Sequence, residues 1–266
     1  MCVFSRSHTF TLGLTLVALL LTLTSATLWA APSVDGRQLV EQLYAPAGVM
    51  PLRDLVVELE CYDLSKESNQ FVLGSTDKVY YKYPNKLRID AVINDPGGSM
   101  DQKEAIIIRD GVNVWNYISM GQYPVKKALD QPSGTLNLPF YVQKYPIDAS
   151  KKYTVKGKKE IDGVSTYEVL IENPQDPNDT KTVFIDAQRR VPLRYDLTRI
   201  SDKEKILVRV QYKEITKLPD GRFFPKKIEI FENDVNTKIR VYTGLQTNCG
   251  LDDSMFNQMK GFTNPY

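Results

Sequence analysis

Apolar and polar residues alternate along most of the chain from residue 54 onward. After Asp54, the residues Leu55, Val57, Leu59 and Cys61 fall on one side of an extended chain and their neighbours on the other, as in a half-buried β-strand. The same period recurs in residues 79–82, 87–91, 104–109, 112–117, 153–159, 165–172, 182–186, 194–198, 205–215, 223–231 and 238–242. The pattern therefore predicts about a dozen strands.

Short turn sequences separate several of these segments. Asp110-Gly111, Asp162-Gly163 and Asp220-Gly221 each stand between two alternating runs, and Asp-Gly supplies the positive φ angles of a tight hairpin. Successive strands are therefore expected to be antiparallel neighbours, whereas the polar residues 173–179 predict a longer exposed loop. So many strands are expected to curl into a barrel or to stack as a sandwich, and a strongly bent sheet encloses an apolar hollow.

Two segments show the helical period instead. Residues 34–43 place their apolar side chains near one face, with Asp35 as the candidate N-cap. Residues 133–145 form a second amphipathic pattern, in which Pro139 suits the first turn of a helix. We expect a mainly β fold with a few helices, the second of which covers the hollow.

Candidate ligand contacts follow from the strand faces and from the second helix. The alternation places Leu55, Val57, Leu59, Leu87, Ile89, Ile106, Ile108 and Trp115 as candidates to line an apolar cavity. The side chains expected to act as a lid over that cavity are Leu138, Phe140, Tyr141 and Val142.

The first thirty residues have the order of a cleavable signal peptide. Arg6 is their only Lys or Arg, an apolar run covers residues 10–23, and small residues surround Ala26 and Ala30. The run is shorter than the about 20 residues that a membrane-spanning helix needs. We therefore expect cleavage after Ala26 or Ala30, export to the periplasm, and a single domain over residues 31–266.

Charge and composition narrow the function further. Of the 34 Lys and Arg residues only Arg6 lies in the leader, which leaves 34 − 1 = 33 basic residues against 32 acidic ones. A nucleic-acid-binding protein usually carries a large positive excess. This near-neutral balance therefore argues against nucleic acid as a partner.

Two cysteines and the absence of histidine decide much of the remaining chemistry. Cys61 and Cys249 are expected to form a disulfide outside the cytoplasm, the alternative being two buried free thiols. No cysteine follows the predicted cleavage site directly, so no lipid attachment is expected there. The single histidine, His8, lies in the leader. Its loss excludes Ser-His-Asp and Cys-His catalysis and the common histidine metal sites.

Three weaker motifs are interpreted as ordinary surface. Residues 97–101 come near a G-x-S-x-G nucleophile elbow but end in Asp101 and have no histidine to serve Ser99. The acidic residues between 90 and 110 fall in predicted turns or at polar strand positions rather than as a carboxylate pair or calcium site. The basic runs at 126–127, 151–152, 156–159 and 226–227 have acids nearby, although such runs also attract anionic head groups.

The order of several short motifs resembles a known family. Residues 80–89 carry Pro84 and Asn85, and residues 107–117 carry Asp110 and Gly111. Together they resemble the periplasmic outer-membrane lipoprotein-sorting carriers, the LolA-like proteins, in which Lys-x-Pro-Asn, an Asp-Gly hairpin and a Trp-x-Tyr strand follow one another. Segments 138–140, 153–155 and 162–169 continue the same order, so the resemblance covers residues 54–242.

This resemblance implies a fold and a function. The fold is a curved antiparallel sheet forming an unclosed β-barrel lidded by short helices. The function is that of a monomeric, non-enzymatic periplasmic carrier without metal or cofactor, which shelters lipid or lipoprotein acyl chains and sorts them toward the outer membrane. Its expected partners are an inner-membrane extraction complex and an outer-membrane acceptor. Tyr83 stands where these carriers often have an arginine that contacts the lid, so the contact that holds the lid is expected to differ.

Three alternatives compete with a carrier. The same fold also serves envelope sensors that bind lipid or mislocalised protein without transporting it. An outer-membrane barrel needs a lipid-facing apolar band, whereas residues 205–215 carry charges on their alternate face. A hydrolase lacks the histidine on which its nucleophile would depend.

Overall fold

The structure is a computed structural model that describes residues 34–44, 49, 51–94, 103–120, 123–128, 148–201, 204–257 and 259 of the 266-residue chain. Two compact units divide the chain at Val34, and the elements described below belong to the second unit, Asp35–Tyr266. Among the residues that the structure describes, no helix has both the length and the apolar character needed to cross a membrane. The predicted signal peptide and the predicted helix at 133–145 lie outside the described residues.

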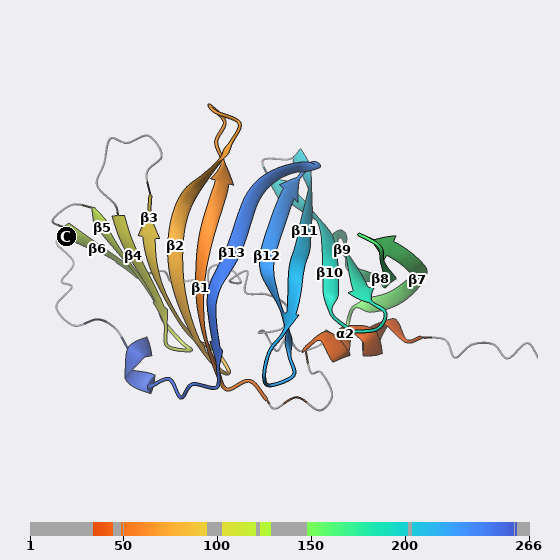
Figure 1. The fold of residues 1–266 in the computed structure, drawn as a ribbon, viewed down its shortest axis with the longest axis horizontal. Coiled ribbons are helices and arrows are strands. Elements are labelled where there is room, and N and C mark those ends of the chain that lie inside the picture. The colour runs from red at the N-terminus through yellow and green to blue at the C-terminus, as the bar shows by residue number, and fades with distance from the viewer. Residues whose placement is uncertain are drawn as a thin grey trace, which may run out of the picture. The chain divides into compact units, whose positions relative to one another are not determined.

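In the described residues, thirteen strands form one antiparallel sheet (Figure 1). They are β1 (Asp54–Leu64), β2 (Phe71–Lys82), β3 (Lys86–Ile93), β4 (Lys103–Arg109), β5 (Val114–Met120), β6 (Tyr123–Ala128), β7 (Lys152–Ile161), β8 (Val164–Asn173), β9 (Asp176–Asp186), β10 (Pro192–Ser201), β11 (Glu204–Lys217), β12 (Phe223–Glu232) and β13 (Val235–Thr247). The prediction of a mainly β protein is therefore confirmed.

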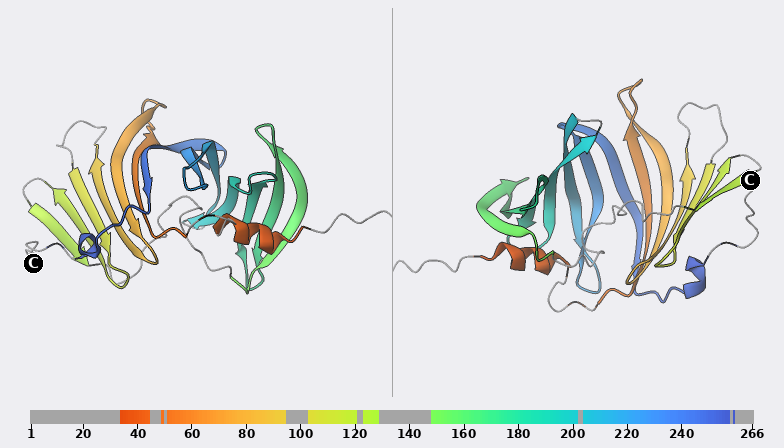
Figure 2. Two further views of the ribbon diagram at one scale, coloured as in Figure 1. Left: turned by 60° about the horizontal axis from the view of Figure 1, so that its bottom comes forward. Right: turned by 180° about the vertical axis from the view of Figure 1, so that it is seen from behind.

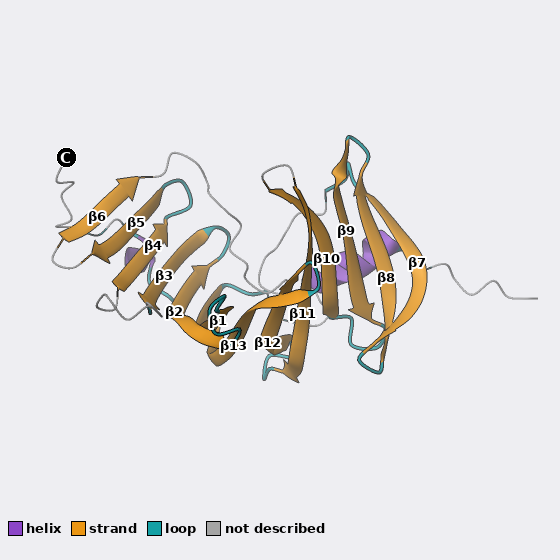
Figure 3. Cartoon of the chain, turned by 90° about the horizontal axis from the view of Figure 1, so that it is seen from above, coloured by secondary structure: helices purple, strands orange, loops and turns teal. Residues whose placement is uncertain are grey.

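The sheet is not closed. Its order is β6-β5-β4-β3-β2-β1-β13-β12-β11-β10-β9-β8-β7, so β6 and β7 are its two edges, as Figure 3 shows from above. Every pairing joins strands that follow one another in the chain, except that of β1 with β13 at the centre. The predicted unclosed antiparallel sheet is confirmed.

The Asp-Gly turns form hairpins where they were predicted. Between β7 and β8, Asp162 has φ 49° and Gly163 has φ 77°, and between β11 and β12 Gly221 has φ 89°. These left-handed angles suit glycine because a side chain is strained there. Consecutive strands therefore return antiparallel through very short turns.

Two local predictions were wrong. Residues 173–179 do not form a long loop, because β8 runs to Asn173 and β9 begins at Asp176. Their polar side chains leave the backbone ladder intact, with Glu172 opposite Thr180. The strand β6 was missed because Pro124 and two lysines hide its alternation, although its backbone pairs with β5 along six residues.

The helix α2 (Gly36–Tyr44) packs on the β7–β10 end of the sheet, as two further views show (Figure 2). Arg37 N donates to the Asp35 carboxylate over 2.9 Å, so the predicted N-cap is present. One helical face buries Leu39, Val40 and Leu43 against strands β8 and β9. A short 3₁₀ helix η1 (Asp253–Phe256) follows β13.

Candidate ligand-binding face

One face of the sheet is apolar across its central strands. Leu55 on β1 lies opposite Tyr81 on β2, which lies opposite Leu87 on β3. Two residues further along β1, Val57 lies opposite Val79, which lies opposite Ile89. All six side chains are buried. We call the sheet face that carries them the inner face.

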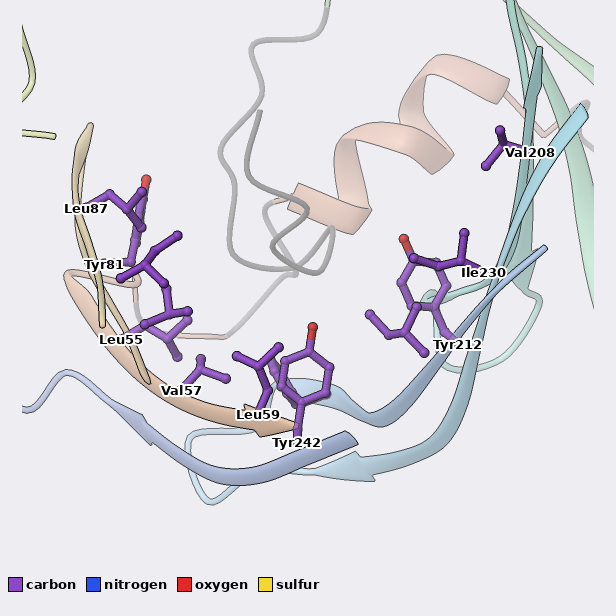
Figure 4. Close-up of a cluster of buried hydrophobic side chains, with 13 residues drawn as sticks. Leu55, Val57, Leu59, Tyr81, Leu87, Val208, Tyr212, Ile230 and Tyr242 are labelled. Atoms are coloured by element: carbon purple, nitrogen blue, oxygen red, sulfur yellow. The ribbon is translucent and has the colours of Figure 1, made fainter. Parts of the chain in front are cut away.

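The inner face continues across β1 onto β13, β12 and β11. Leu59 lies opposite Tyr242, and one apolar cluster joins both to Ile228, Ile230, Tyr212 and Val208 (Figure 4). The Phe224 ring meets Tyr242 edge to face, with 5.0 Å between the ring centroids. Burial raises the pKa of Tyr81 to about 12 and also raises that of Tyr242. The surroundings of both phenols are therefore poorly solvated.

The structure brings five of the eight predicted contacts together and places three elsewhere. Leu55, Val57, Leu59, Leu87 and Ile89 share the inner face. In β4 it is Ile107 that lies opposite Ile89, whereas Ile106 and Ile108 lie opposite Asp90 and Arg88. Trp115 pairs with Ile108 and shares that other face. The predicted register of β4 was therefore wrong by one residue, which reverses every side chain.

The opposite face, which we call the outer face, is crossed by the segment after β13. Lys82 Nζ donates to the Leu251 carbonyl over 2.7 Å, and Lys82 and Lys86 form ion pairs with Asp253. Further along, Met259 N donates to the Tyr117 hydroxyl over 3.1 Å. Residues 249–257 and 259, here called the C-terminal strap, thus attach to β2, β3 and β5. We expect it to shield part of the outer face from ligand.

Asp54 fastens the beginning of the strap. Its side chain is buried and accepts hydrogen bonds from the backbone N–H groups of Cys249, Gly250 and Leu251 and from the Cys249 thiol. Burial alone would raise the pKa of Asp54, but these hydrogen bonds to the carboxylate lower it overall. The ionised carboxylate therefore ties the start of β1 to the residues that follow β13.

The predicted disulfide is absent, since Cys61 and Cys249 are both free. Cys249 lies beside Asp54, while Cys61 is seven residues further along β1. At about 3.3 Å per residue those two positions are roughly 23 Å apart, far beyond the reach of a disulfide. The sequence alone does not show that Cys249 lies at the start of β1 whereas Cys61 lies toward its end.

Polar groups interrupt the inner face toward the end of β1. Asp77 lies opposite Leu59 and accepts a hydrogen bond from the Cys61 thiol at 3.6 Å. Cys61 in turn lies between Ser75 on β2 and Arg240 on β13. Burial, followed by the negative charge of Asp77, raises the pKa of the Cys61 thiol to about 11. The thiol is therefore protonated at neutral pH.

The motif residues lie in turns rather than on the inner face. Asn85, in the β2–β3 turn, donates from Nδ2 to the Gly111 carbonyl in the β4–β5 turn over 3.0 Å. Asp110 accepts from the backbone N–H groups of Val112 and Asn113. Pro84 follows a cis peptide bond, and Tyr83 is exposed. These residues fasten two hairpins together, whereas the predicted lid residues Leu138, Phe140, Tyr141 and Val142 lie outside the described residues.

An open antiparallel sheet with an apolar inner face is the fold of the LolA-type lipoprotein-sorting proteins. The chain is structurally similar to a DUF1329 family protein from Desulfovibrio piger, with a TM-score of 0.59, 11% identity, and coverage of 84% of this chain and 95% of that one. It is also similar to an outer membrane lipoprotein-sorting protein domain from Vibrio parahaemolyticus (TM-score 0.59, 9% identity, 84% and 96% covered). A LolA superfamily protein from Nitrosomonas europaea matches likewise (TM-score 0.55, 11% identity, 85% and 99% covered).

At such low identity this likeness shows the fold alone. The sequence matches no protein-family model. No curated protein matches it either. The unclosed antiparallel sheet that the short motifs had implied is thereby confirmed, and the function has to be argued from the inner face.

Proposed function

We propose that this protein is a monomeric periplasmic carrier that holds lipid or lipoprotein acyl chains on its inner face and delivers them toward the outer membrane. In this proposal residues 1–30 are removed on export and residues 31–266 form a single domain. An inner-membrane extraction complex loads the carrier, and an outer-membrane acceptor unloads it. The observation that carries the proposal is the continuous apolar inner face, which extends from β3 through β1 to β11.

The energetics of acyl binding support a carrier. Burying one CH₂ group contributes about 0.8 kcal/mol, so a chain of about sixteen carbons contributes roughly 12 kcal/mol if fully covered. That amount is large enough to hold a lipid in water, and release then requires an acceptor. The aliphatic and phenolic side chains of the inner face offer contact area of the kind that acyl chains require.

Binding rather than catalysis is also what the chemistry of the inner face favours. Its polar groups include phenols with raised pKa values, a protonated thiol, a carboxylate and the guanidinium group of Arg240. None of these is paired with a histidine, because the only histidine of the sequence is His8. The proposal therefore assigns no catalytic residue.

A pair of neighbouring isoleucines tests which face binds. Ile107 packs against the inner-face cluster, whereas Ile106 points to the outer face, and both are half-buried. Ile107→Ser removes apolar contact worth about 1.4 kcal/mol, so the Kd of a fluorescent fatty acid should rise roughly tenfold. Ile106→Ser is the matched control and should leave that Kd unchanged.

The measurement is fluorescence titration of protein purified without detergent, with native mass spectrometry to detect copurified lipid. Urea unfolding of both variants checks that their stabilities are comparable. Equal Kd values for Ile107→Ser and the unmodified protein would remove the inner face from the binding site. A protein that carries no lipid and takes up no acyl probe at all would refute the carrier function itself.

A further inference from the structure

The inner face changes from apolar to polar along β1. Leu55 and Val57 are 1% exposed and Leu59 is 6% exposed, Cys61 is half-buried, and Asp63 is exposed. The same direction on β3 leads from Leu87 at 3% to Ile93 at 36% exposure. On β13 it leads from buried Tyr242 through Arg240 to exposed Lys238, which forms an ion pair with Asp63 at 3.0 Å. The inner face is therefore amphipathic from one rim to the other.

The rim where β1 begins is closed by packing. Leu52, which precedes β1, and Leu218, from the β11–β12 turn, both pack against the inner-face cluster. Phe224 at the start of β12 is also buried there. We call this the closed rim, and the rim where β1 ends the polar rim.

A carboxylate oxygen between the two rims has no hydrogen-bond partner among the residues that the structure describes. This atom, Asp77 Oδ1, is cut off from solvent, while Oδ2 accepts a weak hydrogen bond from the Cys61 thiol. A buried acceptor without a donor is costly, and a bound donor would remove that cost. Asp77 therefore favours a ligand that brings a hydroxyl, amide or ammonium group to this level of the sheet.

We propose that the acyl ligand lies along β1–β3 with its methyl end at the closed rim and a hydrogen-bond-donating head group beside Asp77. This orientation rests on the proposed acyl-binding function and adds a direction and a head-group class to it. Arg240 lies opposite Cys61 and is therefore on the polar side of the same face. The competing orientation would place an anionic head group at Arg109 on β4, which lies opposite Leu87 on β3.

Two tryptophan reporters at different depths distinguish these orientations. Ile107→Trp reports from near the closed rim and Ile93→Trp from near the polar rim, each in a chain whose Trp29 and Trp115 are replaced by phenylalanine. Ile107 lies opposite Ile89, four residues from Ile93 along β3, so the two reporters are about 13 Å apart. Stearoylethanolamides, whose amide and hydroxyl groups can donate to Asp77, then serve as quenchers, with a nitroxide near either the methyl end or the head group.

The methyl-end nitroxide should quench Ile107→Trp roughly twofold or more above its effect on Ile93→Trp, because quenching falls steeply over about 13 Å. The nitroxide near the head group should show the reverse preference. The opposite pattern, or equal quenching of the two reporters, overturns the orientation while leaving acyl binding in place. If neither probe quenches or binds, the carrier function fails and not merely the orientation.

Substitution of Asp77 tests the head-group class. N-palmitoylethanolamine, whose amide and hydroxyl donate, should displace a bound probe better than palmitate in the unmodified protein, and Asp77→Ala should abolish that preference. Asp90→Ala is the matched control, since Asp90 lies on the outer face opposite Ile106. A preference that persists in Asp77→Ala, or one for palmitate in the unmodified protein, overturns the assignment.

Discussion

Replacing Asp54 with alanine tests how the C-terminal strap is held. The Asp54 carboxylate accepts from the backbone N–H groups of Cys249, at 2.6 Å, of Gly250, at 3.0 Å, and of Leu251, at 3.3 Å. Alanine removes the acceptor of all three groups. At about 1 kcal/mol for each lost hydrogen bond, the free energy of unfolding should fall by about 3 kcal/mol.

The effect should depend on pH with a definite sign. The folded-state pKa of Asp54 is lowered from the ordinary 3.8, so its ionised form stabilises the fold above the unfolded pKa. That contribution is lost as the pH falls through the folded pKa. The difference between the unmodified protein and Asp54→Ala should therefore be complete at neutral pH and should shrink below pH 3.8.

Urea unfolding at neutral and acidic pH measures the difference, with Asp63→Ala as the control on the same strand. Asp63 is exposed and forms a single ion pair with Lys238, so its loss should cost under about 1 kcal/mol. The reasoning is refuted if Asp54→Ala costs no more than Asp63→Ala, or if its effect is the same at both pH values. Hydrogen exchange adds a local readout, because the amides of residues 249–251 should lose protection.

Two further predictions concern the thiols and the turn glycines. In a Cys2→Ser chain purified without reductant, Ellman's reagent should titrate both Cys61 and Cys249. The exposed Cys249 should react first, because the pKa of Cys61 is raised to about 11. Finding no free thiol would restore the disulfide. At Gly111 a Cβ would stand 2.8 Å from Asn85 Oδ1, whereas at Gly163 it would meet open space. Both glycines have positive φ, so Gly163→Ala should cost about 1 kcal/mol in urea unfolding and Gly111→Ala clearly more; equal costs would show that the Asn85 contact contributes nothing.

Strand alternation predicted the inner face where the ladders are regular. Leu55, Val57 and Leu59 share a face with Leu87 and Ile89 because β1, β2 and β3 pair there without interruption. Residues 106–108 are three successive isoleucines, so the pattern of β4 does not show which of them face inward. The pairing of β4 with β3 decides which of its side chains face inward. The sequence of β4 alone does not show that pairing.

Irregular pairing limits prediction elsewhere. The register of β1 with β2 shifts after Cys61, where Ser75 and Leu73 face consecutive residues of β1 and leave Gly74 unpaired. Beyond this bulge the alternation of β2 continues on the other face, which periodicity alone does not reveal. The Asp54 site was missed for a related reason, because its three donors come from residues nearly two hundred positions later in the chain.

The central pairing of β1 with β13 makes this fold a circular permutation of a simple meander. Leu55 lies opposite Thr247, so the start of β1 and the end of β13 are neighbours, while the consecutive strands β6 and β7 form the two edges. If the end of β13 were joined to the start of β1 and the chain were cut between β6 and β7, every strand would lie beside its neighbour in sequence. The strand groups β1–β6 and β7–β13 therefore have low contact order, and each can form by pairing of strands that are neighbours in sequence. Among the strand pairings, only that of β1 with β13 joins segments far apart in the sequence, and the continuous apolar surface exists only once this pairing has formed.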